Sequence, residues 1–421
     1  MLNRNFTLIW ISQALSDTAS EMTSLALPLA VLAATRSVVD ASLVATAVAI
    51  AQLTFRLPAG LIADMFNRKH LMLWCDAVRA AVALLLALAL ASHNLTTILA
   101  VGAAAVTAAG STVFAPAEGG LLRQSVPREL RREAITRNVV RTNLAIAVGP
   151  PLGGLLLGLG APLAFVADAA TYVLSFLMVA QVAYQRLLPP ERESGDAPGG
   201  AVRRTVDELT RGFSWLRHRR ALLMQLAIAA YVNLLGRAIE LLAAISASDL
   251  GRHPVSAGVV LTAAGCGGIV GGLCTGWILR HVRPAWMIAG GAATWLVLMP
   301  LAAVDQVAVA VVAVGLVVFS LPPLGSLVFL TVNTEVPPYL QGRVSTTVML
   351  LAGSIAWAGP GITGFLIASC GAIPTALILV SPLLIPLLAL LLSPSLRRAM
   401  DPVEPEPNEM ELVTPTTGTG R

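Results

Sequence analysis

Long apolar segments, separated by short polar ones, run through almost the whole chain. A helix needs about 20 mainly apolar residues to cross the hydrocarbon core of a membrane. The pattern predicts twelve such helices, with a short turn or a polar loop between neighbours. They lie at about 7–33, 41–63, 70–92, 95–122, 138–160, 162–184, 221–246, 254–279, 284–303, 306–332, 343–367 and 373–394. The alternating segments of about 10 residues that build membrane β-barrels are missing from the sequence. We therefore expect an all-α polytopic membrane protein.

The composition supports this prediction, and the distribution of charge indicates how the protein is oriented in the membrane. Charged residues make up 12% of the chain, against about 25% in soluble domains. The net charge of +5 does not indicate a nucleic-acid partner, because the cations are distributed by side of the membrane. Of the 28 Lys and Arg residues, 22 lie on the side of the N-terminus and only Arg36 and Arg252 lie on the other. By the positive-inside rule both termini are cytoplasmic, in the cell membrane.

Four arginines remain (28 − 22 − 2 = 4), and they lie within the predicted spans. Ionisable residues inside a membrane are costly and usually functional. Arg56 and Arg141 are predicted to be buried charge partners of nearby acids. Asp168 is expected to be a helix cap or packing acid, and Glu118 is expected to be exposed at the membrane interface.

Six residues form the predicted proton-coupling set. Asp17 and Glu21 are four residues apart and share one face of the first helix. Two carboxylates this close repel each other in a low dielectric, so at least one is expected to hold a proton. The other four could form two ion pairs at a spacing of three residues: Asp76 with Arg79, and Arg237 with Glu240. A purely structural role is the alternative for each of these pairs and for Asp17 with Glu21.

An internal repeat organises the chain. The segment Val126–Gly154 recurs in degenerate form at Val336–Gly364, with at least six identities at a constant offset of 210 residues (336 − 126 and 364 − 154). A duplication of roughly half the chain predicts two six-helix halves, the plan of many secondary transporters, with a substrate path between them. We expect four parts: an N-terminal bundle at 1–185, a cytoplasmic linker with an amphipathic helix at 186–220, a C-terminal bundle at 221–394 and a disordered tail at 395–421.

The loop after the second span reads GLIADMFNRK. It resembles the G-x-x-x-D-R-x-G-R-R loop of the major facilitator superfamily. Met65 and Asn67 replace the usual Arg and Gly, and the matching residues are Gly60, Asp64, Arg68 and Lys69. The resemblance implies a cytoplasmic gating loop, in which the aspartate pairs across the contact between the halves and holds the outward-facing state.

A second element, GPPLGG, lies in the fifth span. It resembles the G-P-x-x-G-G element of the antiporter branch of the same superfamily, and the matching residues are Gly149, Pro150, Gly153 and Gly154. Glycine and proline there allow close helix contact and a bend. The opening NFTLIWISQ, FAPA at 114–117 and AFVADA at 164–169 resemble the enterobactin-exporter and macrolide-efflux group.

The resemblance implies proton-driven export of a small hydrophobic or amphipathic molecule, such as a drug, macrolide or siderophore. An importer or sugar transporter of the same fold is one alternative, and a non-transporting membrane sensor is another. The glycine run at 265–272 is predicted to serve close helix packing, because no strand precedes it and no Lys-Ser/Thr ends it. We expect no enzymatic activity, metal site or cofactor. We expect a monomer in the lipid bilayer whose partners are protons and a small-molecule substrate.

Overall fold

The structure is a computed structural model that describes residues 4–125, 131–182, 210, 212–217, 219–248, 253–336 and 340–399. The regular elements in these residues are all helices, and the first half holds six. Eleven segments are long and apolar enough to cross a membrane, and the more polar α1 is the twelfth, which confirms the predicted fold class. The helices of the first half are α1 (Arg4–Thr35), α2 (Val38–Met65), α3 (Arg68–Ala91), α4 (Thr97–Ser125), α5 (Arg131–Leu159) and α6 (Ala161–Ala180).

In the second half, three continuous helices are followed by three interrupted spans. The continuous ones are α8 (Arg220–Ala247), α9 (Pro254–His281) and α10 (Pro284–Ala302). The tenth span consists of α11 (Val307–Phe319) and α12 (Leu321–Glu335), and the eleventh of α13 (Gln341–Gly353) and α14 (Ala358–Cys370). The twelfth joins α15 (Ala372–Val380), the 3-10 turn η2 (Ser381–Leu383) and α16 (Leu384–Leu392), before the short α17 (Pro394–Ala399).

These interruptions differ from the continuous spans that the apolar pattern predicts, and prolines lie near the start of the segment that follows each break. A proline ring clashes with the carbonyl four residues earlier in a helix, but it fits the first turn of a new one. Pro322 and Pro323 follow the first residue of α12, Pro360 lies in the first turn of α14, and Pro382 lies in η2. Each proline therefore begins a new helical segment within one membrane crossing.

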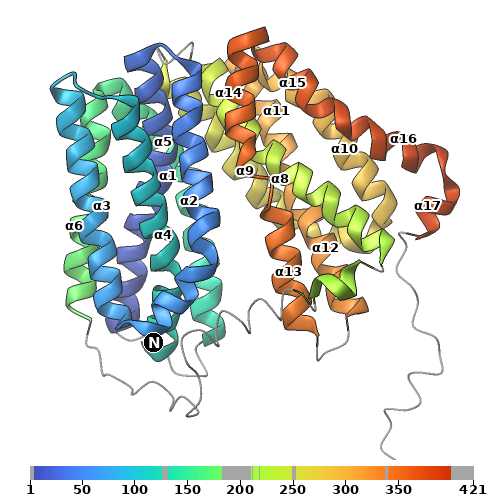
Figure 1. The fold of residues 1–421 in the computed structure, drawn as a ribbon, viewed down its shortest axis with the longest axis horizontal. Coiled ribbons are helices and arrows are strands. Elements are labelled where there is room, and N and C mark those ends of the chain that lie inside the picture. The colour runs from blue at the N-terminus through green and yellow to red at the C-terminus, as the bar shows by residue number, and fades with distance from the viewer. Residues whose placement is uncertain are drawn as a thin grey trace, which may run out of the picture.

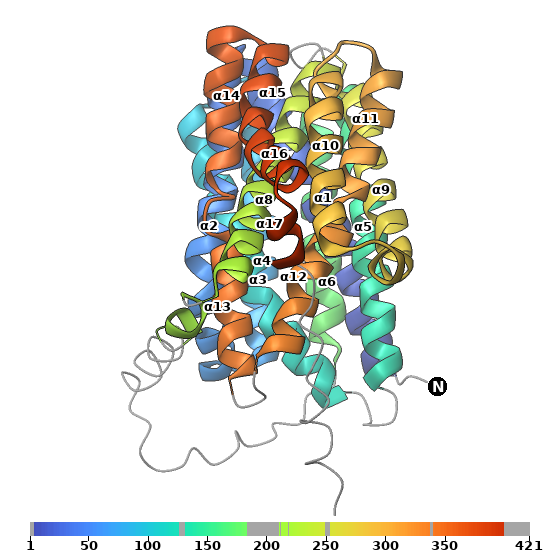
Figure 2. The same ribbon diagram turned by 90° about the vertical axis from the view of Figure 1, so that its right-hand side faces the viewer.

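The two halves lie side by side, the first in blue to green and the second in yellow to red (Figure 1). One end of the bundle, here called the basic face, carries the α2–α3 turn with Arg68 and Lys69 and the start of α1. The other end, the opposite face, carries the turns at Arg36 and Gly160. The most extensive contacts between the halves join α5 with α9 and α2 with α14, and smaller ones join α8 with α1 and α2. The helices of the first half stand upright between the two faces in both Figure 1 and Figure 2, whereas α8, α10 and α15–α16 slope away from the first half in Figure 1.

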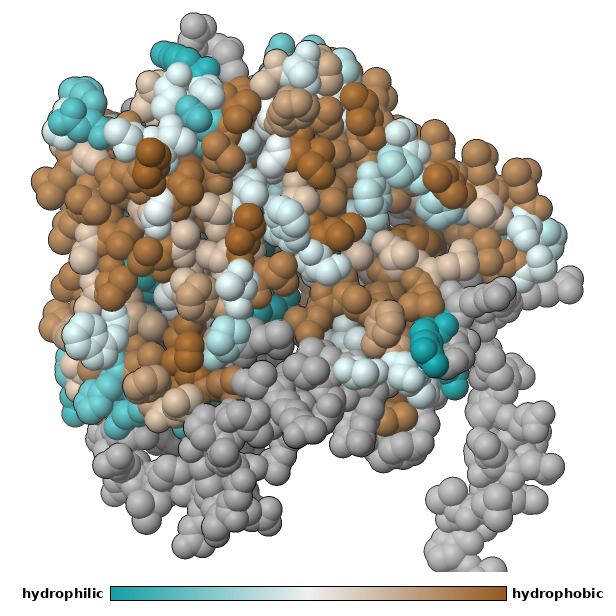
Figure 3. Space-filling model, in the orientation of Figure 1, coloured by the Kyte–Doolittle hydropathy of each residue, from teal (hydrophilic) through white to brown (hydrophobic). Residues whose placement is uncertain are grey.

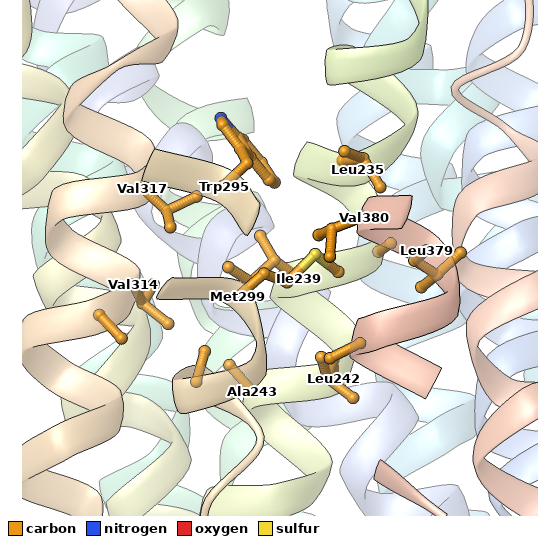
Figure 4. Packing of buried hydrophobic residues seen from close by; sticks show 14 of the residues in the cluster. Leu235, Ile239, Leu242, Ala243, Trp295, Met299, Val314, Val317, Leu379 and Val380 are labelled. Atoms are coloured by element: carbon orange, nitrogen blue, oxygen red, sulfur yellow. The ribbon is translucent and has the colours of Figure 1, made fainter. Parts of the chain in front are cut away.

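Each half has its own hydrophobic core. In the second half, Trp295 and Met299 of α10 pack against Ile239 of α8 and Val314 of α11 (Figure 4). The outer surface at mid-height is mainly hydrophobic, and hydrophilic residues gather toward the two ends of the first half (Figure 3). This surface is what a lipid-facing protein requires, because apolar side chains match the hydrocarbon around them.

One further cluster draws buried residues from both halves. It lies near the opposite face, where the ends of α1 and α8 meet; its members are Leu25, Leu29, Leu32, Ala41, Leu241, Ala244, Ile245 and Ala257. Among the described residues, the other hydrophobic clusters each belong to one half. The halves are therefore packed together toward the opposite face.

The structure describes the last residues of the predicted linker and the first residues of the predicted tail. Residues 183–209, which include the expected start of the amphipathic helix, and residues 400–421 of the tail lie outside the described residues. Residues 212–216 are helical; Leu216 is buried against α12 and α13, while Phe213 is exposed. Residues 395–399, which the sequence assigns to a disordered tail, belong to α17.

Candidate functional site: a cavity between the halves

A cavity of about 500 Å³ lies between the two halves at mid-height. Its lining comes from α1, α2, α4 and α5 of the first half and from α8, α9, α11, α12 and α14 of the second. Leu25, Leu29, Leu241 and Ile245 of the joint cluster close it toward the opposite face. Most of the other lining side chains are apolar as well, so the few charged ones determine its electrostatics.

Three charged side chains line this cavity, and one of them has no bonding partner. Arg237 Nη1 lies 3.2 Å from Glu240 Oε2 on the same helix, and its Nη2 lies 3.4 Å from Gln52 Oε1 of the other half. Glu21 of α1 interacts electrostatically with both Arg237 and Glu240, but its carboxylate takes part in no hydrogen bond or ion pair within the described part of the chain. The cavity lining thus holds two carboxylates and one guanidinium, of which one carboxylate is paired with the guanidinium.

Asp17, one turn before Glu21, belongs to a different group. Arg141 of α5 lies between two acids: its Nη1 is 2.7 Å from Glu118 Oε1, and its Nε is 3.1 Å from Asp17 Oδ2. The Nε contact is an ion pair without the alignment of a hydrogen bond. Arg141 and Glu118 are both buried. The expectation that Glu118 is exposed at the interface is therefore wrong, because its partner Arg141 holds it inside the bundle.

Asp76 and Arg79 form a second, deeper ion pair. Their side chains are 0% and 2% exposed, and Asp76 Oδ1 lies 2.5 Å from Arg79 Nη2. The Ser175 hydroxyl of α6 donates to Asp76 Oδ2 at 2.7 Å, and Arg79 Nη1 donates to the Ser111 hydroxyl of α4 at 3.2 Å. The guanidinium also packs over the rings of Phe114 and Tyr172, 4.8 and 4.4 Å from their centres. A buried pair with this many partners holds α3, α4 and α6 together.

Asp168 of α6 is buried close to this pair, with 1% of its surface exposed. The Thr23 hydroxyl of α1 lies 2.6 Å from its Oδ2, whereas its Oδ1 is buried without a hydrogen-bond partner. Asp168 is not the cap of α6, which begins at Ala161 after Gly160. Sequence reasoning gave this residue no functional role, although its position within an apolar span was a usable signal.

The prediction for Arg56 is wrong. Its side chain is exposed and forms no ion pair within the described residues. It lies instead against α13, where a Cβ on Gly353 would be 3.4 Å from its Nη1. Arg56 therefore reaches across to the second half and is not a buried partner of the acids in the first.

The candidate gating loop makes its contacts within the first half. Asp64 Oδ1 lies 3.3 Å from Arg68 Nη2, and the Arg68 side chain covers Gly120 of α4. Lys69 Nζ donates to the Ala180 and Val182 carbonyls at the end of α6, at 2.7 and 2.8 Å. Asn67 caps α3, since its side chain accepts the N–H groups of Lys69 and His70. This cap gives a local reason for asparagine where the resembling loops have glycine.

The Gly-Pro element of α5 has two contact faces. A Cβ on Gly149 would lie 2.5 Å from Glu21 Cβ, and one on Gly153 would lie 2.7 Å from the Met22 carbonyl, so both glycines let α1 approach within the first half. A Cβ on Gly154 would instead lie 2.6 Å from the Pro254 carbonyl of α9. Pro150 lines the cavity. One element thus serves packing within a half and contact between halves.

The second copy of the element repeats these contacts. A Cβ on Gly359 would meet the Leu234 carbonyl and Arg237 Cβ, as Gly149 meets the Thr18 carbonyl and Glu21 Cβ; both partners are shifted by 216 residues (234 − 18 and 237 − 21). Gly364 contacts Val38 and Ser42 of α2, the counterparts of Pro254 and Gly258, which contact Gly154 (254 − 38 = 258 − 42 = 216). Glu21 and Arg237 therefore occupy equivalent positions of the two halves.

The glycine run of α9 packs against its neighbours. Gly265 faces the backbone of Ala147 in α5, while Gly267 and Gly271 face the backbone of α11 at Gly315 and Phe319. The prediction of close helix packing for this run is confirmed.

Comparison with known proteins agrees with this architecture. The model of the Major Facilitator Superfamily matches residues 9–360. The chain belongs to the Major Facilitator Superfamily. No curated protein matches it in sequence.

Several solved transporters of low sequence identity share its fold. A bacterial homolog of the human lysosomal transporter Spinster, inward-facing and unoccupied, superposes with a TM-score of 0.70 at 13% identity, over 94% of this chain and 97% of that one. The nucleoside transporter NupG gives 0.71 at 11% identity, over 92% and 98%. A bacterial homologue of the iron transporter ferroportin, inward-facing, gives 0.69 at 14% identity, over 93% and 100%. These superpositions establish the fold of this major facilitator protein.

Proposed function

We propose that this protein is a secondary active transporter that exports a small hydrophobic or amphipathic molecule in exchange for protons. The observation that carries the proposal is the cavity between the halves, closed toward the opposite face and lined by the unpartnered carboxylate of Glu21. Its size and its mainly apolar lining suit a drug-sized molecule. The antiporter-type element at Gly149–Gly154 favours export over import.

The distribution of arginine and lysine supports a cytoplasmic basic face. The cluster that joins the halves then closes the extracellular side, so the conformation is inward-facing. In this proposal both termini lie in the cytoplasm, and the protein is a monomer in the plasma membrane. The Asp64–Arg68 pair fits this state, because its partners lie within the first half, and pairing across the halves is expected only when the cytoplasmic side closes.

Among the predicted proton-coupling residues, Glu21 is the best suited to exchange a proton with the cavity. Asp17 and Asp76 each face an arginine, which stabilises their ionised forms. Glu21 has no such direct partner and faces Glu240 across the cavity, and two carboxylates near each other favour a proton on one of them. In the second half, Glu240 is likewise paired with an arginine, Arg237.

Transport then follows an alternating-access cycle. With the cavity open to the outside, Glu21 takes up a proton, and the loss of its charge changes the attraction between Glu21 and Arg237. The halves rock about the α5–α9 and α2–α14 contacts, and the cavity opens to the cytoplasm. The proton leaves, the cargo binds, and the return movement releases the cargo outside. The ligand biases a two-state equilibrium by its different affinity for each state.

The test is accumulation of ethidium and of radiolabelled erythromycin in cells that express the full-length protein, with and without a protonophore. We expect lower accumulation than in cells with the empty vector, and loss of the difference when the protonophore is added. Glu21→Gln should abolish the difference, while the matched control Asp305→Asn, an exposed acid outside the cavity, should keep it. Higher accumulation than in the empty-vector cells would support the importer alternative, and no effect on either probe would contradict export of this cargo class.

A further inference from the structure

Asp168 stands in an electrostatic setting unlike that of the four other acids near the centre of the first half. Asp17, Asp76 and Glu118 each contact an arginine at 3.1 Å or less, and Glu21 lines the cavity. Asp168 is buried and forms no ion pair within the described residues; its neighbours are two neutral hydroxyls, that of Thr23, which lies 2.6 Å from Oδ2, and that of Tyr172. An ionised carboxylate in that position would lack the compensation that burial of a charge requires.

The groups around Asp168 confirm that its charge is not balanced in this conformation. The helices packed against α6 are α1, α3 and α5, and their ionisable residues in this region are Asp17, Glu21, Asp76, Arg79 and Arg141. Of these, Arg79 acts on Asp168 electrostatically, and the Tyr172 hydroxyl on α6 itself interacts with it as well. Arg79 already pairs with Asp76 at 2.5 Å and with Ser111. The neutral, protonated acid is therefore the form that fits.

Asp168 also has a route to water. Thr23 lines the central cavity, and its hydroxyl lies 2.6 Å from Asp168 Oδ2, a distance at which either oxygen can donate. A protonated Oδ2 donates to Thr23 Oγ1; after the proton leaves, the Thr23 hydroxyl donates to Oδ2. The proton passes to cavity water, so that the carboxylic acid and water become a carboxylate and hydronium.

We propose that Asp168 is a second proton-binding site of the transporter, protonated in the conformation seen here and connected to the central cavity by Thr23. The inference rests on the proposed proton coupling, to which it adds a site behind the cavity wall and distinct from Glu21.

Two buried polar atoms without hydrogen-bond partners indicate what deprotonation of Asp168 would change. Asp168 Oδ1 and Arg79 Nε are both buried without hydrogen-bond partners, and one is an acceptor while the other is a donor. Tyr172 lies next to both residues. When Asp168 loses its proton, the Arg79 guanidinium gains a second carboxylate to pair with, in addition to Asp76. Because Arg79 also contacts α4 through Ser111, loss of one proton changes the contacts of α1, α3, α4 and α6 together.

The experiment is infrared difference spectroscopy of the purified full-length protein in lipid, in neutral and alkaline buffers. The spectrum of the wild type minus that of Asp168→Asn in neutral buffer should contain the C=O band of a carboxylic acid, and this band should disappear in alkaline buffer. Carboxylate bands in the neutral difference spectrum would overturn the proposal. Asp305→Asn should leave the carboxylic acid region unchanged, and Glu21→Gln should leave the Asp168 band in place.

A second variant covers the case in which Asp168→Asn does not fold. Thr23→Val removes the hydrogen bond to Oδ2, so the carboxylic acid band of the otherwise intact protein should move in frequency; an unchanged carboxylic acid region would overturn the proposal. These spectra need no cargo. If the wild type expels its cargo but shows no Asp168 band in neutral buffer, this site alone is rejected. If the wild type shows the band but has no proton-dependent efflux, the proposed function is rejected.

Discussion

Substitution of Gly154 by alanine should shift the protein away from the conformation described above. Gly154 lies where α5 crosses α9 near the opposite face, and an added Cβ would lie 2.6 Å from the Pro254 carbonyl oxygen and 3.2 Å from Gly258 Cα. Both neighbours are backbone atoms, which cannot rotate away as a side chain can. The variant therefore acts on the contact that holds the halves together on this side.

The size of the effect follows from that contact. Ordinary van der Waals contact for a Cβ begins near 3.4 Å, so the two helices must separate locally by about 0.8 Å (3.4 − 2.6). Overpacking of this kind costs about 1–3 kcal/mol. Because this cost falls on one of the two conformations, the equilibrium between them should shift about 5- to 150-fold toward the state that is open at the opposite face.

Two distances between spin labels report this shift, in a background that lacks the four native cysteines. Labels at the exposed positions Ile98 and Ile373 measure the opposite face, and labels at Met65 and Trp277 measure the basic face. In Gly154→Ala we expect the first distance to lengthen and the second to shorten.

Two glycine controls separate this effect from general damage. Gly272→Ala on α9 adds a methyl group where no atom lies within 4 Å, and should leave both distances unchanged. Gly153→Ala strikes the Met22 carbonyl within the first half, and should lower thermal stability without changing the ratio of the two conformations. Wild-type distances in Gly154→Ala, or an equal shift in Gly153→Ala, would refute the reasoning.

Three further substitutions test the packing and the charge groups. Arg141→Met leaves two carboxylates without their cation and should lower the free energy of unfolding by about 3–5 kcal/mol, measured by thermal unfolding. Adding Asp17→Asn and Glu118→Gln should restore most of this loss. An unchanged stability in Arg141→Met would show that Arg141 does not stabilise the two acids. Trp295→Ala removes the largest buried side chain of the second half and should cost about 3–5 kcal/mol, and Trp295→Phe clearly less, in the same measurement. Lys69→Met removes two hydrogen bonds to the end of α6 and should cost about 1–3 kcal/mol, seen as faster hydrogen exchange at residues 178–182 than in the wild type.

The fold could be predicted because membrane insertion acts on long apolar segments. Twelve runs of sufficient length give twelve spans, and the repeat of Gly149-Pro150 at Gly359-Pro360 gives two related halves. The breaks at Ser320 and near Ser354 escaped the hydropathy pattern, since the residues on both sides of each break are apolar. The prolines that follow were the available signal.

The charge groups were harder to predict, because their partners depend on helix rotation. Apolar residues surround each span, so periodicity does not show which face turns inward. Asp76 and Arg79 could be paired because both lie on one helix. Arg141 bridges α1 and α4, and Asp168 meets α1 through Thr23; no spacing along the chain encodes such contacts. The prediction for Arg56 was wrong for the same reason, since the rotation of α2 directs this side chain toward α13.

The exchange of charge at equivalent positions gives the cavity a direction. The two halves superpose their contacts around Gly149 and Gly359, yet one half presents the acid Glu21 where the other presents the base Arg237. A scaffold with near two-fold symmetry would otherwise accept an elongated molecule in two equivalent poses. With Glu21 on one wall and the Arg237–Glu240 pair on the other, the cavity has an asymmetric distribution of charge. A cargo that is itself dipolar should therefore bind in one pose and leave the protein with the same end leading each time.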